Sequence, residues 1–417
     1  MKSPHSRLPV IGWALYDWAN SAFSLTVVTA FVPVLLAQYW NDGAASTLTT
    51  FRLGWANALA SLVVALIAPV VGAIADRASC RKGLLLVFAA LGVVMTGALH
   101  FVAQGQWFIA VALYVFASVG FAGSNSLYDA LLSAVSAEEN FDRVSALGYA
   151  LGYLGGALLF TLNVLMVANP GRFGLASELE AMRLAFLLVA IWWAVFSIPL
   201  LLFVPEDRGA ARSVAHSVAD GLRQLKETLA KIRSHRATLT FLLAYWLYID
   251  GVYTIIKMAV DYGLSQGLNM DDLIQAVLIT NYVGFPAALA FGAFGARFGA
   301  KRGIILALSV YLAATMAAPF INTEAEFYGL AIAIGLVQGG VQSLSRSLFA
   351  RLIPVGQSAE FFGFYNMLGK FAAILGPALV GVVALATGSQ RIGILSIIVL
   401  FIAGLALLTR VQVRPAA

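Results

Sequence analysis

Long apolar runs alternate with short polar segments along the whole chain. A helix needs about 20 mostly apolar residues to cross a bilayer, and twelve runs are long enough. Their expected limits are 10–38, 51–75, 83–103, 107–134, 143–168, 182–204, 237–262, 272–296, 302–321, 325–352, 360–386 and 390–410. The pattern predicts an all-α polytopic membrane protein with twelve transmembrane helices.

One long polar stretch, 205–236, separates the sixth predicted span from the seventh. It divides the chain into an N-terminal six-helix bundle at 1–204, a cytoplasmic linker at 205–236 and a C-terminal six-helix bundle at 237–417. The spacing of the linker's apolar residues fits an amphipathic helix lying on the membrane surface. A simple solvated linker fits the same residues equally well.

Composition supports a lipid-solvated protein. Apolar residues make up 61% of the chain and charged residues only 11%, whereas soluble domains have roughly 45 to 50% and about 25%. Cys80 is the single cysteine, so a disulfide within the chain is excluded.

The positions of lysine and arginine predict the orientation. Of 26 such residues, only Arg52, Arg172, Arg183 and Arg391 fall in loops on the side opposite the N-terminus, and three more fall within spans. Cytoplasmic loops carry the excess of basic residues in membrane proteins. We therefore expect both termini in the cytoplasm, in a bacterial cytoplasmic (inner) membrane.

The two halves of the chain repeat each other without inversion. The loop GAIADRASCRK from Gly72 matches GAFGARFGAKR from Gly292, an offset of 220 residues. NSLYDALL from Asn125 matches QSLSRSLF from Gln342 at an offset of 217. Parallel repeats of this kind are typical of transporters whose halves move against each other around a central site.

The loop from Gly72 resembles the signature loop of the major facilitator superfamily, which implies a fold of two pseudo-symmetric six-helix bundles. Its glycine allows two helices to approach closely, and Asp76 can meet a helix N-terminus or an arginine across the interface. In the second half Ala296 replaces the acid, so we expect only the first loop to form this latch. The expected cytoplasmic gate consists of Gly72, Asp76, Arg77, Arg81 and Arg346.

Three further stretches resemble one branch of that superfamily, the autophagy-linked vacuolar amino-acid effluxers of fungi. They are WALYDWANSAF from Trp13, LYDALL from Leu127, and GGVQSLSRSLFARLIP from Gly339 continuing through EFFGFYNMLGKFAAILGP to Pro377. The resemblance covers both halves. It implies export of small solutes, with amino acids as the substrate class.

Six ionisable residues lie within or at the edges of spans: Asp17, Asp129, Asp250, Lys257, Arg346 and Lys370. A charge at the centre of a membrane helix costs about 2.5 to 3.5 kcal/mol on insertion scales. These groups must therefore pair between helices, face a water-filled cavity, or be neutral. Asp250 and Lys257 share a helix face but are about 10.5 Å apart along the axis, too far to pair directly.

We expect these groups to surround a watery substrate site between the bundles. The candidate substrate-binding residues are Lys370, Lys257, Asp250, Tyr253, Asn20, Tyr153, Tyr149, Asn125, Gln342 and Asn366. Lys370 or Lys257 is expected to hold an anionic group of the substrate. The candidate proton carriers are Asp17, Asp250 and Asp129, because desolvation favours the protonated form of a carboxyl group. The competing interpretation makes the same charges static interhelical pairs, with Asp129 and Arg346 as gate or snorkelling residues.

The sequence predicts a secondary active transporter of a small polar or zwitterionic solute, working by alternating access as a monomer. The coupling ion is a proton or sodium, membrane lipid surrounds the chain, and no nucleic acid is bound. No phosphate-binding loop follows a strand and the four histidines are scattered, so we expect no enzyme activity, no cofactor and no metal. The alternatives are a lipid scramblase, a receptor and a membrane-embedded enzyme.

Overall fold

The computed structural model describes residues 7–41, 46–206, 232–354 and 356–412, and most of them are helical. Eleven described helical segments are long and apolar enough to cross a membrane. The one remaining expected span, 360–386, corresponds to α14 (Ser358–Thr387), whose described apolar stretch is Leu375–Thr387. The predicted all-α membrane architecture is confirmed. Helices suit a bilayer because they satisfy every backbone hydrogen bond within the segment.

Each half of the chain supplies one group of helices. In the first half the long helices are α1 (Leu8–Ala22), α3 (Ser46–Ala78), α4 (Arg81–Ala98), α5 (Trp107–Ala130), α7 (Phe141–Ala168) and α8 (Glu178–Phe203). In the second half they are α10 (Arg236–Ser265), α11 (Met270–Phe298), α12 (Ala300–Ala317), α13 (Glu324–Leu352), α14 and α16 (Ile398–Arg410). The shorter helices α2 (Val32–Leu35), α6 (Leu132–Val135) and α15 (Gln390–Leu395) complete the labelled set.

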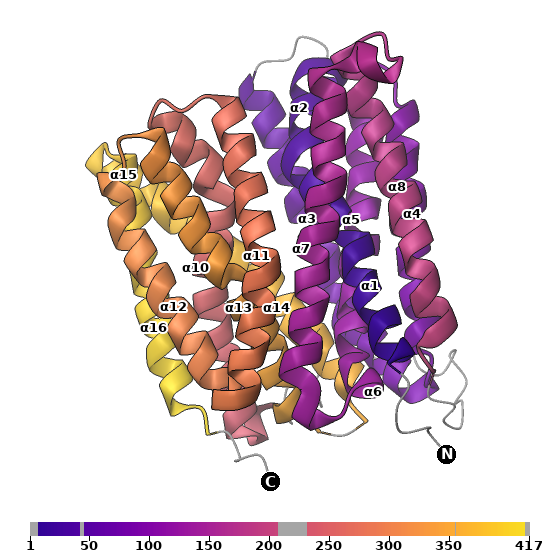
Figure 1. The fold of residues 1–417 in the computed structure, drawn as a ribbon, viewed down its shortest axis with the longest axis vertical. Coiled ribbons are helices and arrows are strands. Elements are labelled where there is room, and N and C mark those ends of the chain that lie inside the picture. Colours follow the sequence, from indigo (N-terminus) through magenta and orange to yellow (C-terminus); the bar gives the residue numbers. More distant parts are fainter. Residues whose placement is uncertain (1–6, 42–45, 207–231, 355, 413–417) are drawn as a thin grey trace.

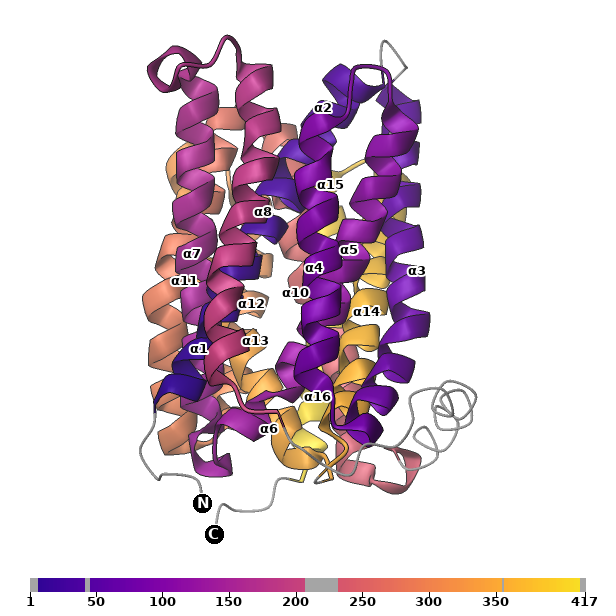
Figure 2. The ribbon, with the colours of Figure 1, turned by 90° about the vertical axis from the view of Figure 1, so that its right-hand side faces the viewer.

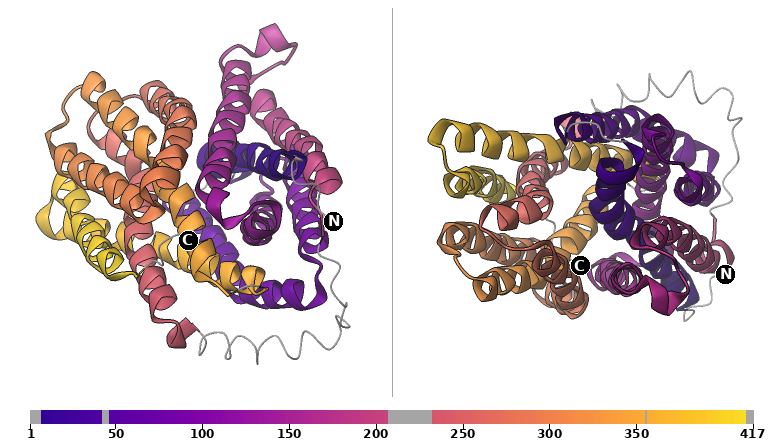
Figure 3. Two further views of the ribbon diagram at one scale, coloured as in Figure 1. Left: turned by 60° about the horizontal axis from the view of Figure 1, so that its bottom comes forward. Right: turned by 90° about the horizontal axis from the view of Figure 1, so that it is seen from above.

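The two groups stand side by side, and α1 begins at the end of the molecule where α16 ends (Figure 1, Figure 2). The right panel of Figure 3 shows the same two groups from above. Between the halves, α7 packs against α11 and α13, while α14 packs against α3 and α5. We call the end that holds Leu8 and Arg410 the termini face, and the opposite end the far face. Most of the predicted linker at 205–236 lies outside the described residues.

The internal repeat is visible in the backbone of the two matching loops. Ser79 and Gly299 are equivalent at the offset of 220, and both have positive φ angles, 52° and 92°. The left-handed conformation suits glycine and is uncommon for serine. The lysines of the two loops also act alike. Lys82 donates to the carbonyl of Val204 after α8 at 2.9 Å, and Lys301 to that of Val411 after α16 at 2.8 Å.

The first span differs from an ordinary α-helix. After α1 the chain continues as a π-helix over Phe23–Phe31, then α2, then a second π-helix over Leu36–Trp40. The hydrophobic pattern predicts a span here, at 10–38, but carries no signal for the wider helix. Such π segments occur frequently at functional sites, and Ser24, Leu25 and Val28 of this one face the central cavity.

Candidate functional site

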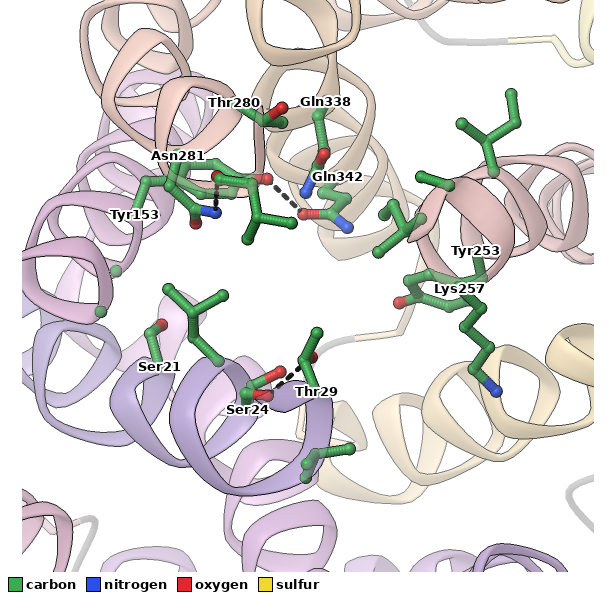
Figure 4. A pocket seen from close by; sticks show the side chains of 18 of the residues that line it. Ser21, Ser24, Thr29, Tyr153, Tyr253, Lys257, Thr280, Asn281, Gln338 and Gln342 are labelled. Carbon is green, nitrogen blue, oxygen red and sulfur yellow. Dashed lines mark hydrogen bonds between the residues drawn. The ribbon is translucent and has the colours of Figure 1, made fainter. Parts of the chain in front are cut away.

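A cavity of about 540 Å³ lies between the two halves. Its walls come from helices of both halves, and Figure 4 shows Ser21 and Ser24 of the first span facing Gln338 and Gln342 of α13 across it. The cavity contains these predicted substrate-binding and proton-carrying residues in its wall: Asp17, Asn20, Asn125, Asp129, Tyr149, Tyr153, Tyr253, Lys257, Gln342 and Asn366. Asp250 is not part of the wall. Lys370 lies in α14, but its side chain is outside the described ones.

Arg346 of α13 forms the floor of this cavity together with two acids of the other half. Its Nη1 donates to Asp129 Oδ1 at 3.0 Å and to Asp17 Oδ2 at 3.4 Å. Its Nε and Nη2 donate to the hydroxyl and carbonyl of Ser145 on α7, at 2.9 and 2.8 Å. Arg346 is 1% exposed. A guanidinium presents its donors in a planar fork, so one side chain can bind several acceptors at once.

Aromatic rings enclose the same guanidinium. Its carbon lies 4.3 Å from the ring centre of Tyr149, 4.8 Å from Trp13 and 5.3 Å from Tyr128. Trp13 stacks on Tyr128 with 4.4 Å between ring centres, and its indole N–H donates to the Tyr128 carbonyl at 2.9 Å. Cation–π contacts of this kind partly replace the lost hydration of a buried arginine.

Each acid on the floor has a second hydrogen-bond donor. The Tyr128 hydroxyl donates to Asp17 Oδ2 at 2.9 Å, and Asn366 Nδ2 of α14 donates to Asp129 Oδ2 at 2.9 Å. Among the described residues, both hydrogen bonds to the Asp17 side chain therefore end on Oδ2, and Oδ1 remains for a ligand or water. We call Asp17, Asp129, Arg346 and Asn366 the floor network.

Above the floor the wall is rich in amides and phenols. Asn20 Nδ2 donates to Asn125 Oδ1 at 2.7 Å within the first half. Across the halves, the Tyr153 hydroxyl donates to Gln342 Oε1 at 2.7 Å (Figure 4). These bonds leave the Nδ2 of Asn125 and the Nε2 of Gln342 as donors for a ligand.

Lys257 is an exposed cation in the wall, and it forms no ion pair among the described side chains. It lies nine residues beyond Tyr248, whose hydroxyl is 2.7 Å from that of Ser345, the neighbour of Arg346. Nine helical residues rise roughly 13 Å. Lys257 and the floor network therefore lie at two different depths of the cavity.

Asp250 occupies a different environment from the other acids. Its side chain is fully buried between α10 and α14, and Oδ1 accepts a hydrogen bond from the backbone N–H of Gly376 at 3.0 Å. Oδ2 has no hydrogen-bond partner among the described residues.

The termini face is closed by a first contact between α3 and α14. Asp76 Oδ1 and Oδ2 accept from the backbone N–H groups of Ala359 and Glu360, at 3.1 and 2.9 Å, in the first turn of α14. Arg81 Nε also donates to Oδ1, at 2.6 Å. A carboxylate suits this place because a helix N-terminus has free N–H groups and a positive dipole end. The expected contact of Asp76 with a helix N-terminus is present, whereas the side chain of Arg77 is outside the described ones.

A second contact, between α7 and α13, closes the same face and was missed by sequence reasoning. Arg351 donates to both carboxylate oxygens of Asp142, at 2.8 and 3.1 Å, and the Ser347 hydroxyl donates to the same carboxylate. Asp142 and Arg351 lie at the edges of predicted spans, where charged residues are ordinarily interpreted as marking the membrane boundary. The offset of 217 makes Asp142 equivalent to Ala359, which indicates that this residue lies at a matching interface.

Both closing contacts lie at the termini face. The wall of the cavity extends to Tyr262, Leu273 and Phe327, which lie in the far-face turns of α10, α11 and α13. The cavity is therefore blocked below by the floor network and the two contacts, and it reaches the far face.

Two features of the described part of the chain concern metal binding and thiol reactivity. No group of three or more His, Cys, Asp or Glu side chains that could hold a metal ion occurs there. Partial burial raises the pKa of the Cys80 thiol, and the nearby Glu206 carboxylate adds to this effect. The thiol is therefore a weak nucleophile near neutral pH.

Sequence comparisons place the chain among transporters. The family model described as "Vacuole effluxer Atg22 like" matches residues 47–417. The protein YxiO of Bacillus subtilis, described as an uncharacterized MFS-type transporter, is 36% identical over 399 residues, which cover 95% of this chain and 93% of that one. Autophagy-related protein 22-1 of Aspergillus fumigatus is 28% identical over 299 residues, which cover 65% of this chain and about half (48%) of that protein.

Solved structures show the same fold. The human organic anion transporter MFSD10 superimposes with a TM-score of 0.74 at 18% identity, covering 97% of this chain and all (100%) of that one. The transporter FucP in its outward conformation superimposes with a TM-score of 0.71 at 13% identity, covering 98% and 99%. Identities this low support the fold alone.

Proposed function

Because the chain belongs to the Atg22-like family of major facilitator transporters, we propose that it exports a small polar or zwitterionic solute, an amino acid or a related metabolite, by alternating access. Membership in a transporter family excludes the embedded-enzyme alternative. The observation that carries the proposal is the polar cavity between the halves, closed at the termini face and extended to the far face.

The wall chemistry supports a zwitterionic substrate. Asp17 Oδ1 is an acceptor for an ammonium group, while the amides of Asn125 and Gln342 are donors for a carboxylate. Amino acids carry both groups, so we assign one molecule to this part of the wall. Lys257 lies roughly 13 Å of helix rise beyond Tyr248, away from the floor network. We assign it to the entry path, where a cation attracts anionic groups.

The charge count of the floor network supports proton coupling. Two carboxylates, Asp17 and Asp129, share the single guanidinium of Arg346. The network carries one net negative charge when both acids are ionised. Either one proton or one substrate ammonium group neutralises it. The network therefore favours one monocation at a time, which links proton binding to substrate binding.

Location and direction rest on sequence patterns. The bias of basic residues supports cytoplasmic termini in a bacterial inner membrane. In that orientation the closed termini face is cytoplasmic and the cavity reaches the outside. The family description, vacuole effluxer, supports export.

Transport by purified protein in liposomes tests the proposal. Liposomes loaded with an amino-acid panel would be diluted into solute-free buffer, with a proton gradient, a sodium gradient or neither, while a fluorescent lipid reports scrambling. We expect loss of at least one amino acid, faster with the proton gradient.

The matched pair of variants is Asp17→Asn and Asp272→Asn. Asp272 is also a buried acid but lies outside the cavity wall, in the first turn of α11. We expect Asp17→Asn to remove the proton dependence and Asp272→Asn to keep it. Lipid scrambling without solute movement, or no movement of any solute by folded protein, would contradict the proposal.

A further inference from the structure

Asp250 does not belong to the cavity, yet its position is highly specific. Its side chain is 0% exposed and lies against the backbone of α14 rather than against another side-chain charge. Thr254, one turn along α10, donates its hydroxyl to the Asp250 carbonyl at 2.7 Å and lies 3.5 Å from Oδ1. The second carboxylate oxygen, Oδ2, accepts no hydrogen bond within the described residues.

An ionised carboxylate is unfavourable at this position. Burying a charge away from water is costly unless it is paired and hydrogen-bonded, whereas the neutral acid loses far less on burial. Asp17 and Asp129 have Arg346 as a counter-charge, but Asp250 forms no ion pair in the described part of the chain. The neutral, protonated form is therefore the one that suits this conformation.

No charged neighbour forms an ion pair with Asp250 among the described side chains. Lys257, two turns along α10, is the charged group whose field acts on Asp250. The helices that pack against α10 carry these other charged residues: Asp271, Asp272, Arg297, Glu324, Glu326, Arg346, Arg351, Glu360, Lys370 and Arg410. Tyrosines on these helices are neutral near pH 7.

The contact falls where α14 is weakest. Pro377 has no N–H and disrupts the helical hydrogen bonding around it. Gly376 allows the approach, because a Cβ at that position would collide with the Thr254 hydroxyl and would lie 2.9 Å from Asp250 Oδ1. The carboxyl group thus binds a backbone N–H next to a helix break, a place where a long helix bends.

The lower part of the same helix is held by the other half of the molecule. Asp76 binds the first turn of α14, and Asp129 binds Asn366. Asp250, in contrast, belongs to α10 in the same half as α14. Opening the termini face separates the lower part of α14 from Asp76 and Asp129. The contact between Asp250 and Gly376 lies within one half, so this separation does not break it.

We propose that Asp250 is a proton-binding site outside the substrate cavity, and that its protonation sets the bend of α14 at Gly376–Pro377 and thereby the opening of the termini face. Loss of the proton makes the carboxylate a charged and stronger acceptor for the Gly376 N–H. The ionised carboxylate also needs water or a counter-charge at Oδ2. Both changes favour a different bend of α14 at Gly376–Pro377. The inference deepens the proposed proton coupling and rests on the proposed function.

A conformational measurement tests this without knowledge of the substrate. Spin labels at Glu139→Cys and Arg302→Cys, both exposed at the termini face on opposite halves, would be placed in a Cys80→Ser background. Pulsed electron paramagnetic resonance then gives the distance between the halves from acidic to basic pH. We expect the distance distribution to change with pH and to stop changing in Asp250→Asn, which keeps an acceptor oxygen but cannot ionise.

Two controls separate this site from general damage. Asp272→Asn should keep the pH response. Gly376→Ala should remove it by displacing Asp250, whereas Gly381→Ala in the same helix, with no atom within 4 Å of the added Cβ, should keep it. Infrared difference spectra should show a protonated carboxyl band that is lost in Asp250→Asn.

Three results would overturn the proposal. They are a wild-type distance that ignores pH, a pH response that survives in Asp250→Asn, and a response removed by Asp17→Asn instead. Failure of the solute panel to reveal transport would refute the proposed function but would leave this distance measurement and its outcome intact.

Discussion

At the scale of single residues, Arg346 is the side chain on which the floor of the cavity depends. It joins α13 to α1, α5 and α7 through four hydrogen bonds and three ring contacts, and both acids that it binds are themselves buried. Removing one partner of a buried ion pair leaves an uncompensated charge, which is more costly than replacing all partners.

Arg346→Gln should therefore destabilise the protein by about 3 to 5 kcal/mol, the usual cost of breaking a buried pair. The measurement is thermal unfolding in detergent, compared with Arg297→Gln, which removes an exposed arginine at the termini face. Adding Asp17→Asn and Asp129→Asn to Arg346→Gln should recover much of the loss. An Arg346→Gln protein as stable as Arg297→Gln would refute this role.

The sequence contains a usable signal for one of these pairs. Asp129 and Arg346 are 217 residues apart, the offset of the internal repeat. Residues that a twofold repeat makes equivalent face each other when they lie near its axis, so opposite charges there indicate a pair. The partners Ser145, Tyr128 and Trp13 carry no such signal, because their contacts depend on helix rotation that the hydrophobic pattern does not determine.

At the scale of elements, the closed termini face depends on how closely helices of the two halves approach. Gly72 of α3 lies against the backbone of α14, where an added Cβ would be 2.7 Å from the carbonyl carbon of Ala359. The equivalent Gly292 of α11 lies against α7 in the same way, 3.2 Å from the Asp142 carbonyl oxygen. Both contacts need a small residue.

Gly72→Ala should shift the protein toward an open termini face. Overpacking costs about 1 to 3 kcal/mol, and about 1 kcal/mol corresponds to roughly a fivefold change in an equilibrium. A cysteine at Ser358, which is buried here, should then react at least five times faster with a soluble thiol reagent in a Cys80→Ser background. Gly54→Ala in the same helix has open space around its Cβ and should leave the rate unchanged.

The α7–α13 contact should matter as much as the α3–α14 contact. Arg351→Gln removes both bonds to Asp142 and leaves that buried acid without its cation. We expect the Ser358→Cys reaction to accelerate in Arg351→Gln, with Arg297→Gln as the control. Equal rates in the two variants would show that the α3–α14 contact alone keeps this face closed.

Element positions were largely predictable, because apolar length fixes a membrane span whatever its neighbours are. The spans expected at 107–134 and 325–352 correspond to α5 with α6 and to α13 within a few residues. The second closing contact was not predictable in the same way. The sequence shows that Ala296 replaces the acid in the second loop. It does not show that a pair between α7 and α13, Asp142 with Arg351, takes over the contact, because that pair is recognised only when the helices are packed.

At the scale of the whole molecule, the two faces differ. The termini face is closed and the cavity extends to the far face, which corresponds to one step of a transport cycle. Most of the hydrogen bonds between the halves lie at or near the termini face, and the Thr161–Tyr282 hydroxyl pair lies farther toward the far face. The cavity extends to the far-face turns of α10, α11 and α13. Alternating access requires the reverse arrangement as well. The contacts at the termini face must therefore break and re-form once in each cycle.

A reversible cross-link across the closed face tests this requirement most directly. The hydroxyl oxygens of Ser133 and Ser358 lie 3.0 Å apart on opposite halves, so cysteines at both positions in a Cys80→Ser background can form a disulfide. We expect oxidation to stop transport of the solute found in the liposome panel and reduction to restore it, while each single-cysteine variant is unaffected. Undiminished transport by the fully cross-linked protein would contradict this expectation.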